Sequence, residues 1–226
     1  MITPRKRSAK NAPRFRGDPE GMLLPCRAVL FDCDGVLVDS DASVLAAWTR
    51  WAHELDLDPD VVIPVVHGRR SADTVAELVD APRRVAAAAL IDRFEVEDAA
   101  SVGAIAGAGA LTNVVPRWAV VTSGHRELAA ARLRAAGIAV PEVLVTADDV
   151  ERGKPDPEGY LAAARRLGVA AAETVVLEDA AAGIAAARAA GVSAVVAVGG
   201  REELNGDVRV GDLTELSWVK DGLLAH

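Results

Sequence analysis

The sequence predicts an α/β fold in which a parallel β-sheet is interrupted, after an early strand, by a block of helices. Residues 28–31 form an apolar run of strand length that ends at Asp32-Cys33-Asp34-Gly35. Residues 41–100 show the apolar spacing of helices and no convincing strand. From residue 117 onward, short apolar runs alternate with helical segments, which is typical of βαβ units and a parallel sheet.

The apolar run at residues 28–31 has the composition of a parallel strand that is buried on both faces. Side chains alternate along a strand, so Asp32 and Asp34 are expected on the same side. Two ionised carboxylates would repel each other in a dry site, so either one is protonated or a cation lies between them. The same residues also fit an ordinary turn at the end of a strand.

The block at residues 41–100 is predicted to form a helical domain of its own. Val44, Trp48, Trp51 and Leu55 recur along one face of a helix over residues 40–56. Further helices are expected at 58–66, 72–79 and 82–100, with a loop at residues 67–70. We therefore expect a helical cap at 41–100, inserted into a core made of residues 22–40 and 101–226.

The later strands are expected at residues 117–121, 143–145, 174–177 and 194–198. Each apolar run is short and is separated from the next by a helical segment. Ligands bind at the carboxyl ends of strands in an open parallel sheet, so the residues after these runs are the natural place for a site.

Composition and charge narrow the function classes. The 226 residues carry a net charge of −8, but residues 1–21 hold six basic and two acidic residues, so the remainder carries −12. The basic segment is expected to be a disordered tail, and no nucleic-acid partner is expected for the acidic body. No apolar run is long enough for a membrane span. The two cysteines favour a reducing cytoplasm, and nothing in the sequence distinguishes a monomer from a homodimer.

Polar residues follow four of the predicted strands or lie in the loops beside them. Lys154 is the only lysine between residues 11 and 219. Each group also has an ordinary structural explanation, because serine and threonine cap helices, acids suit a helix N-terminus and a lysine between turn formers is usually solvated. The groups are Asp32 with Asp34, Thr122-Ser123-Gly124, Lys154, and Glu178 with Asp179.

In this order, the four groups resemble the motifs of the haloacid dehalogenase (HAD) superfamily, over about residues 28–198. The resemblance implies a Rossmann-like, HAD-like sheet core with an inserted α-helical cap. It is closest to sugar and sugar-alcohol phosphatases and to beta-phosphoglucomutase. The matching segments are Asp32-Cys33-Asp34-Gly35-Val36, Val121-Thr122-Ser123-Gly124, Gly153-Lys154-Pro155-Asp156-Pro157 and Leu177-Glu178-Asp179-Ala180.

The resemblance implies a role for each group. Asp32 is the expected nucleophile, which forms an aspartyl phosphate, and Asp34 is the expected general acid and base. Lys154 balances the negative charge of Asp32 and the phosphate. Thr122, Ser123 and Gly124 are expected to hold the phosphoryl oxygens. The implied cofactor is Mg²⁺, with Asp32, the backbone carbonyl of Asp34, Glu178 and Asp179 as its ligands.

The same comparison separates the branches of the superfamily. Asp34 excludes the dehalogenases, which lack the second aspartate, and the absence of lysine from residues 41–100 disfavours the phosphonate-cleaving branch. Sugar phosphomutases typically carry a histidine in the first cap helix, where this chain has Val44. The loop residues His67, Arg69 and Arg70 are similar to a cap loop that binds substrate, although a solvated loop also fits them.

The predicted function is therefore a Mg²⁺-dependent phosphatase that hydrolyses a small phosphorylated sugar or sugar alcohol. A hexose-phosphate mutase of the same fold is the first alternative. The second is a non-catalytic protein that binds phosphate or nucleic acid, against which the complete motif set argues.

Overall fold

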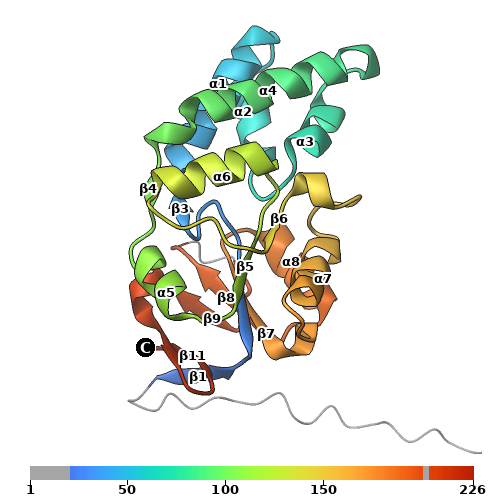
Figure 1. Ribbon diagram of the computed structural model, residues 1–226. Coiled ribbons are helices and arrows are strands. Elements are labelled where there is room, and N and C mark those ends of the chain that lie inside the picture. The colour runs from blue at the N-terminus through green and yellow to red at the C-terminus, as the bar shows by residue number, and fades with distance from the viewer. Residues whose placement is uncertain (1–20, 201–203) are drawn as a thin grey trace, which may run out of the picture.

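The computed structural model describes residues 21–200 and 204–226 (Figure 1). Its main sheet has six strands in the order β6-β5-β2-β7-β8-β9, and all neighbouring strands pair in parallel. The predicted fold class is thereby confirmed, with the first apolar run, β2, in the interior of the sheet. The strands are β2 (Ala28–Phe31), β5 (Trp118–Val121), β6 (Leu144–Val145), β7 (Thr174–Glu178), β8 (Ala194–Val198) and β9 (Val208–Val210).

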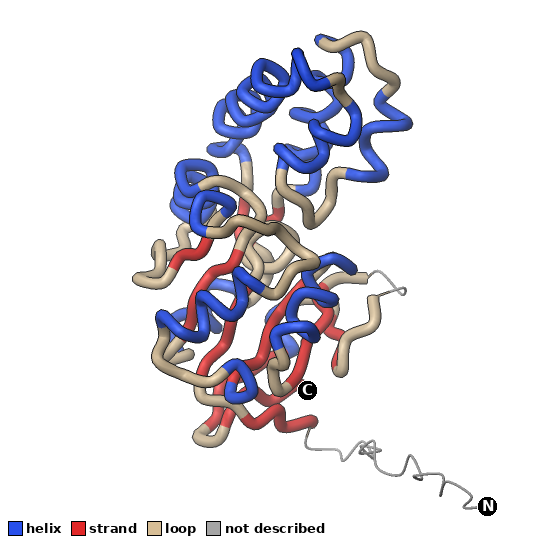
Figure 2. Tube along the Cα trace, turned by 90° about the vertical axis from the view of Figure 1, so that its right-hand side faces the viewer, coloured by secondary structure: helices blue, strands red, loops and turns tan. Residues whose placement is uncertain are grey.

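Helices cover both faces of this sheet (Figures 1 and 2). Alternation along β2 sends Val29 and Phe31 into one apolar cluster and Leu30 into another. The first cluster includes residues of α5 (Ala108–Val114) and α6 (Arg126–Ala135). The second includes residues of α7 (Glu158–Arg166) and α8 (Ala181–Ala190). Because β2 is buried on both sides, it is apolar throughout.

A block of helices lies above the carboxyl end of the sheet (Figures 1 and 2). It follows β3 (Val38–Asp39) and precedes β4 (Gly103–Ala104), which pair antiparallel, so the chain leaves and re-enters the sheet region at adjacent points. The block has its own apolar cluster, which includes Trp48, Trp51 and Phe94. Its helices are α1 (Asp41–Glu54), α2 (Pro59–Val62), α3 (Ser71–Leu78) and α4 (Arg84–Asp98), with 3-10 turns at Ile63–Val65, Ala81–Arg83 and Ala99–Ser101.

A small antiparallel sheet was not anticipated from the sequence. It has the order β1-β11-β10 and joins β1 (Met22–Pro25) to β11 (Gly222–Ala225) and β10 (Leu216–Val219). Met22 pairs with Ala225, so the sheet ties the start of the described chain to its end. The predicted basic tail at 1–21 lies, except for Gly21, outside the described residues. Within the described ranges, no helix is both long and apolar enough to cross a membrane.

Candidate active site

The site is built at the carboxyl ends of three adjacent strands. Asp32 follows β2, Thr122 follows β5 and Glu178 ends β7, and β2 lies between the other two strands. The backbone N–H of Asp32 donates to the carbonyl of Leu177 at 3.0 Å, which holds the ends of β2 and β7 together. Residues far apart in the sequence therefore meet because the sheet is parallel.

Lys154 lies between two of the carboxylates. Its Nζ donates to Oδ1 of Asp32 at 2.7 Å and to Oε1 of Glu178 at 2.6 Å. The side chains of Lys154 and Asp32 are each 6% exposed, and that of Glu178 is fully buried. Burial by itself would lower the pKa of Lys154, but Asp32 and Glu178 raise that pKa well above its ordinary value. Lys154 is therefore a fixed positive charge in the site.

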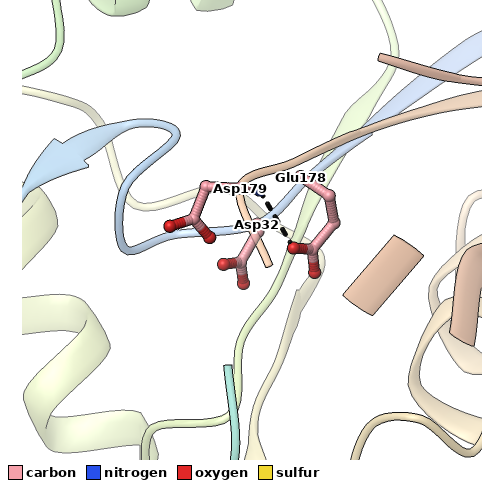
Figure 3. Close-up of side chains that lie close together, drawn as sticks. All are labelled: Asp32, Glu178 and Asp179. Atoms are coloured by element: carbon pink, nitrogen blue, oxygen red, sulfur yellow. Dashed lines mark hydrogen bonds between the residues drawn. The ribbon is translucent and has the colours of Figure 1, made fainter. Parts of the chain in front are cut away.

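Asp179 completes a cluster of three carboxyl groups. One oxygen each from Asp32, Glu178 and Asp179 lies within 4.8 Å of the others, and Figure 3 shows the three side chains converging from two strand ends. Burial raises the pKa of Asp32, Lys154 opposes this shift, and Glu178 and Asp179 add to it. Carboxylate oxygens are the ligands of hard divalent cations, so these residues fit such an ion.

Two glycines give the acidic side chains the space they occupy. A Cβ atom at Gly183, in α8, would lie 1.6 Å from Oε1 of Glu178. A Cβ atom at Gly35 would lie 2.3 Å from Oδ2 of Asp179, and the φ of Gly35 is +72°. The close approach of both carboxylates therefore depends on the absence of a side chain at these two positions.

Both oxygens of Glu178 are held by hydrogen bonds. The Tyr160 hydroxyl donates to Oε1 at 2.7 Å, and the backbone N–H groups of Asp179 and Ala180 each donate to Oε2 at 3.1 Å. Sequence reasoning did not single out Tyr160, although it is the only tyrosine in the chain. It lies on the buried face of α7, where core packing is the ordinary role of an aromatic side chain.

Asp34, two residues after Asp32, has its own set of hydrogen-bond partners. Ser40 Oγ donates to Asp34 Oδ1 at 2.7 Å, and Arg132 Nη1 donates to the same oxygen at 2.9 Å. Arg132 belongs to α6, and its Nη2 lies 3.5 Å from Oε1 of Glu95 in α4. Ser71 Oγ, in α3, donates to Oε2 of Glu95 at 3.3 Å.

Glu95 and Arg132 were missed by sequence reasoning. Burial raises the pKa of Glu95 to about 7, Arg132 opposes the shift, and Asp34 and Asp92 add to it. One sequence pattern points to Arg132: it lies on the buried face of α6 with Leu128 and Leu133, where an arginine requires a partner. Glu95 on α4 has no comparable pattern, because α4 is weakly amphipathic.

The segment 122–124 turns away from β5 into α6. The backbone N–H of Gly124 donates to Thr122 Oγ1 at 3.0 Å. Ser123 Oγ donates to the carbonyl of Gly68 in the loop of the helical block at 3.1 Å. The cap of α6 is His125, whose Nδ1 accepts from the backbone N–H of Leu128 at 3.3 Å. The ordinary explanation of Thr122 and Ser123 as the helix cap is therefore wrong.

The loop at 67–70 reaches the site with only part of its residues. His67 and Arg69 line the same cavity as Asp32 and Asp34, and Arg69 Nη1 also lies 2.7 Å from Oε2 of Glu77. Arg70 lies elsewhere: its Nε and Nη2 donate to Asp73 at 2.7 and 2.9 Å, and its Nη1 donates to the Glu151 carbonyl at 3.1 Å. Arg70 does not line that cavity, but it lines a neighbouring one together with Thr122, Ser123 and Lys154.

A cavity between the helical block and the end of the sheet collects most of the predicted residues. Its walls come from both parts of the chain, and Val44 and Trp48 of α1 supply an apolar side. Its lining residues are Asp32, Asp34, Ser40, Asp41, Val44, Trp48, Val66, His67, Gly68, Arg69, Ser71, Glu95, Thr122, Ser123, Gly124, Leu128, Arg132 and Asp179.

The fold and site define a hydrolase class, and sequence comparison identifies it. Residues 26–191 match the family model described as haloacid dehalogenase-like hydrolase, and the chain belongs to that family. The chain is 39% identical to hexitol phosphatase A of Escherichia coli (strain K12), over 74% of this chain and 80% of that protein. It is 35% identical to glycerol-1-phosphate phosphohydrolase 2 of Saccharomyces cerevisiae, over 75% of this chain and 74% of that protein.

The predicted enzyme class, a HAD-type phosphatase, is confirmed by these relatives. The family is typically metal-dependent, in agreement with the acidic cluster. Among solved structures, beta-phosphoglucomutase from Clostridium difficile matches with a TM-score of 0.75 and 22% identity, over 85% of this chain and 94% of that one. At this identity the likeness shows the fold alone.

Proposed function

We propose that this protein hydrolyses a small phosphorylated sugar or sugar alcohol through an aspartyl-phosphate intermediate, with Mg²⁺ as its metal. The observation that carries the proposal is the position of Asp32. It is buried at the end of β2, in contact with Lys154, beside Glu178 and Asp179, and on the wall of a cavity that Asp34 also lines.

Asp32 and Asp34 have different roles in the two halves of the proposed reaction. A carboxylate oxygen of Asp32 attacks phosphorus and forms a new P–O bond while the bond to the substrate oxygen breaks. Asp34 gives its proton to that leaving oxygen. Asp34, now ionised, then removes a proton from a water molecule whose oxygen attacks the aspartyl phosphate. This step releases inorganic phosphate, regenerates the carboxylate of Asp32 and returns the proton to Asp34.

The remaining polar residues of the core stabilise charge. Lys154 offsets the negative charge of Asp32 and of the phosphoryl group. Thr122 and the backbone N–H groups of Ser123 and Gly124 are the proposed donors to the phosphoryl oxygens. Mg²⁺, when bound by Asp32, the Asp34 carbonyl, Glu178 and Asp179, supplies positive charge that neutralises the phosphoryl oxygens.

The helical block is proposed to select the leaving group. Two named relatives act on hexitol and glycerol phosphates, which are phosphorylated polyols. His67 and Arg69 line the cavity and are the proposed contacts to substrate hydroxyl groups. Arg70 is proposed to contribute indirectly, because its bond to the Glu151 carbonyl ties the loop to the core.

The alternatives receive less support. Val44 lines the cavity at the position where sugar phosphomutases typically carry a histidine, so a phosphatase is favoured over a mutase. A non-catalytic role does not account for the buried ion pairs of Lys154 with Asp32 and Glu178. We further propose a cytoplasmic enzyme with a core at 22–40 and 101–226, a cap at 41–100 and a small phosphorylated metabolite as its partner.

The test is a screen of phosphorylated polyols and sugars with released phosphate as the readout, on the wild type and on Asp32→Asn. We expect Mg²⁺-dependent release by the wild type, loss of at least about 10³-fold in the variant, and no effect of Asp39→Asn, an exposed control. Phosphate release by Asp32→Asn at the wild-type rate, or full activity in excess chelator, would contradict the proposal. A requirement for a bisphosphate activator with little phosphate release would favour the mutase.

A further inference from the structure

A buried arginine connects Asp34 to the helical block. The Arg132 side chain is 2% exposed, and its guanidinium lies between Asp34 Oδ1, at 2.9 Å, and Glu95 Oε1, at 3.5 Å. Asp34 follows β2 and Arg132 belongs to α6, whereas Glu95 belongs to α4 of the helical block. A guanidinium has a fixed planar shape with several donors, so one group can bridge two carboxylates that a single ammonium could not hold at once.

The contacts to Asp34 fix one particular oxygen. Arg132 Nη1 and Ser40 Oγ both donate to Oδ1, and neither donates to Oδ2. Because Oδ1 already accepts two hydrogen bonds, Oδ2 is the oxygen left to carry the proton in the acid step of the proposed function. The Asp34 side chain remains 30% exposed and lines the cavity, so this proton is accessible to a bound substrate.

Glu95 supplies a carboxylate partner on the side of Arg132 that faces the helical block. Its side chain is 7% exposed, and its second oxygen accepts a hydrogen bond from Ser71 in α3 at 3.3 Å. Two helices of the block, α3 and α4, therefore hold the carboxylate that faces Arg132. Without Glu95, the Nη2 group of the buried Arg132 would lack its carboxylate partner, which is costly for a buried charge.

We propose that Arg132 is a positioning residue for Asp34: it orients the proton-bearing Oδ2 toward the leaving oxygen, and Glu95 holds Arg132 in place. The inference rests on the proposed function, in which Asp34 is the general acid and base. Arg132 acts through Asp34 and takes no part in bond making. Errors of about 1 Å in the position of a catalytic group lower rates by roughly 10²-fold, so such support has a measurable effect.

Two substrates with different leaving groups can show whether Arg132 positions the acid or has only a structural role. The alkoxide of a polyol phosphate must be protonated as it leaves, whereas 4-nitrophenolate leaves without a proton. If Arg132 positions the acid, its loss slows aspartyl-phosphate formation from a polyol phosphate far more than from 4-nitrophenyl phosphate. A structural role would slow both alike.

The variants are chosen so that the protein still folds. Arg132→Met alone leaves Glu95 buried without its partner, so Arg132→Met/Glu95→Gln removes both charges together. Arg132→Lys keeps the charge but loses the fork that spans two carboxylates. Arg134→Met is the matched control, since Arg134 is an exposed arginine on the same helix. Thermal melting and circular dichroism establish that each variant is folded.

The experiment is rapid-quench measurement of the first turnover with Mg²⁺ present. The substrates are 4-nitrophenyl phosphate and whichever of glycerol 1-phosphate and the hexitol 6-phosphates the wild type hydrolyses fastest. For the double variant we expect the polyol reaction to slow by roughly 10²- to 10³-fold and the aryl reaction by less than about tenfold. KM for the polyol phosphate should change little, Arg132→Lys should be intermediate and Arg134→Met should equal the wild type.

Equal losses on both substrates, or no loss on either, would overturn the inference about Arg132. A loss confined to KM would also overturn it, because it would make Arg132 a substrate-binding residue. None of these results would affect the proposed function. That proposal fails separately, if the wild type forms no aspartyl phosphate from any tested ester or if Asp32→Asn forms it as fast as the wild type.

Discussion

The hydroxyl of Tyr160 donates a hydrogen bond of 2.7 Å to Oε1 of Glu178, the same oxygen that Lys154 contacts at 2.6 Å. Glu178 is fully buried, and its other oxygen accepts two backbone N–H groups. The orientation of this carboxylate is therefore set by Tyr160, Lys154 and two backbone N–H groups. Glu178 is a proposed metal ligand, and replacing a group that orients a metal ligand typically changes the metal affinity.

Tyr160→Phe removes this hydrogen bond and leaves the ring in place. We expect the Mg²⁺ concentration for half-maximal activity to rise about 10-fold, with maximal kcat reduced much less, because Glu178 loses one of its orienting donors. Titration calorimetry of Mg²⁺ into the metal-free variant measures the same change without turnover. A variant that binds Mg²⁺ like the wild type would show that Lys154 and the backbone suffice to orient Glu178.

The space beside Glu178 gives a second prediction. Gly183→Ala places a methyl group where Oε1 of Glu178 now lies, since the nearest approach would be 1.6 Å. We expect the carboxylate to be displaced, with Mg²⁺ affinity weakened by at least about tenfold and a loss of roughly 1–3 kcal/mol in the free energy of unfolding.

Gly109→Ala is the matched control for Gly183→Ala. Gly109 also lies in a helix, α5, and a Cβ atom there would meet nothing within 4 Å. The substitution should stabilise the protein by about 0.5–1 kcal/mol and leave activity unchanged. Chemical denaturation and Mg²⁺ titration of the two variants check both expectations. Unchanged Mg²⁺ binding in Gly183→Ala would show that Glu178 can move without loss of its function.

The loop arginines should behave differently from each other. Arg69 lines the cavity, so Arg69→Gln should raise KM for the preferred polyol phosphate by about tenfold, the loss of one charged hydrogen bond of roughly 1.5 kcal/mol. KM for 4-nitrophenyl phosphate should change little. Glu77→Gln removes the ion-pair partner of Arg69 and is the control for that pair.

Arg70→Gln tests the contrast. Arg70 binds Asp73 and the Glu151 carbonyl, so its replacement should loosen the contact between the loop and the core. The steady-state constants for the polyol phosphate and for 4-nitrophenyl phosphate should then change to the same extent. Steady-state kinetics on the two esters separates the outcomes. A selective rise in KM for the polyol phosphate in Arg70→Gln would mean that Arg70 reaches the substrate after all.

The sequence predicted the parts of the fold that have a local pattern. The buried run 28–31 became the interior strand β2, and the spacing of Val44, Trp48 and Trp51 gave helix α1. The position of Lys154 beside Asp32 agrees with the expectation that polar groups in the loops after parallel strands meet at one edge of the sheet. Strand alternation and the helical period act over a few neighbouring residues. The meeting of the loops follows from the parallel order of the strands.

The features that were missed depend on pairing at long range. The β1-β11-β10 sheet joins residues some two hundred positions apart, and no pattern near Met22 specifies Ala225 as its partner. Glu95 on α4 looks like an ordinary helix residue until the fold places it 3.5 Å from Arg132. Arg69 and Arg70 are adjacent residues of the same type, but Arg69 pairs with Glu77 and Arg70 pairs with Asp73, which no local sequence pattern specifies.

Glu95 makes stability depend on pH in a predictable direction. Burial raises its pKa from 4.5 to about 7 in the folded protein, against the opposing effect of Arg132 and with smaller contributions from Asp34 and Asp92. Between these two values the folded state binds more protons than the unfolded state, so the free energy of unfolding falls as pH rises through this window.

Glu95→Gln isolates this contribution because the amide does not titrate. From pH 4.5 to pH 7 the free energy of unfolding of the wild type should fall relative to that of the variant, by up to about 3 kcal/mol. Denaturant titrations at several pH values measure the difference. Glu97→Gln, an exposed position on the same helix, should follow the wild-type curve. Parallel curves for the wild type and Glu95→Gln would mean that Arg132 keeps Glu95 ionised throughout, and that the bridge to Asp34 is a fully charged one.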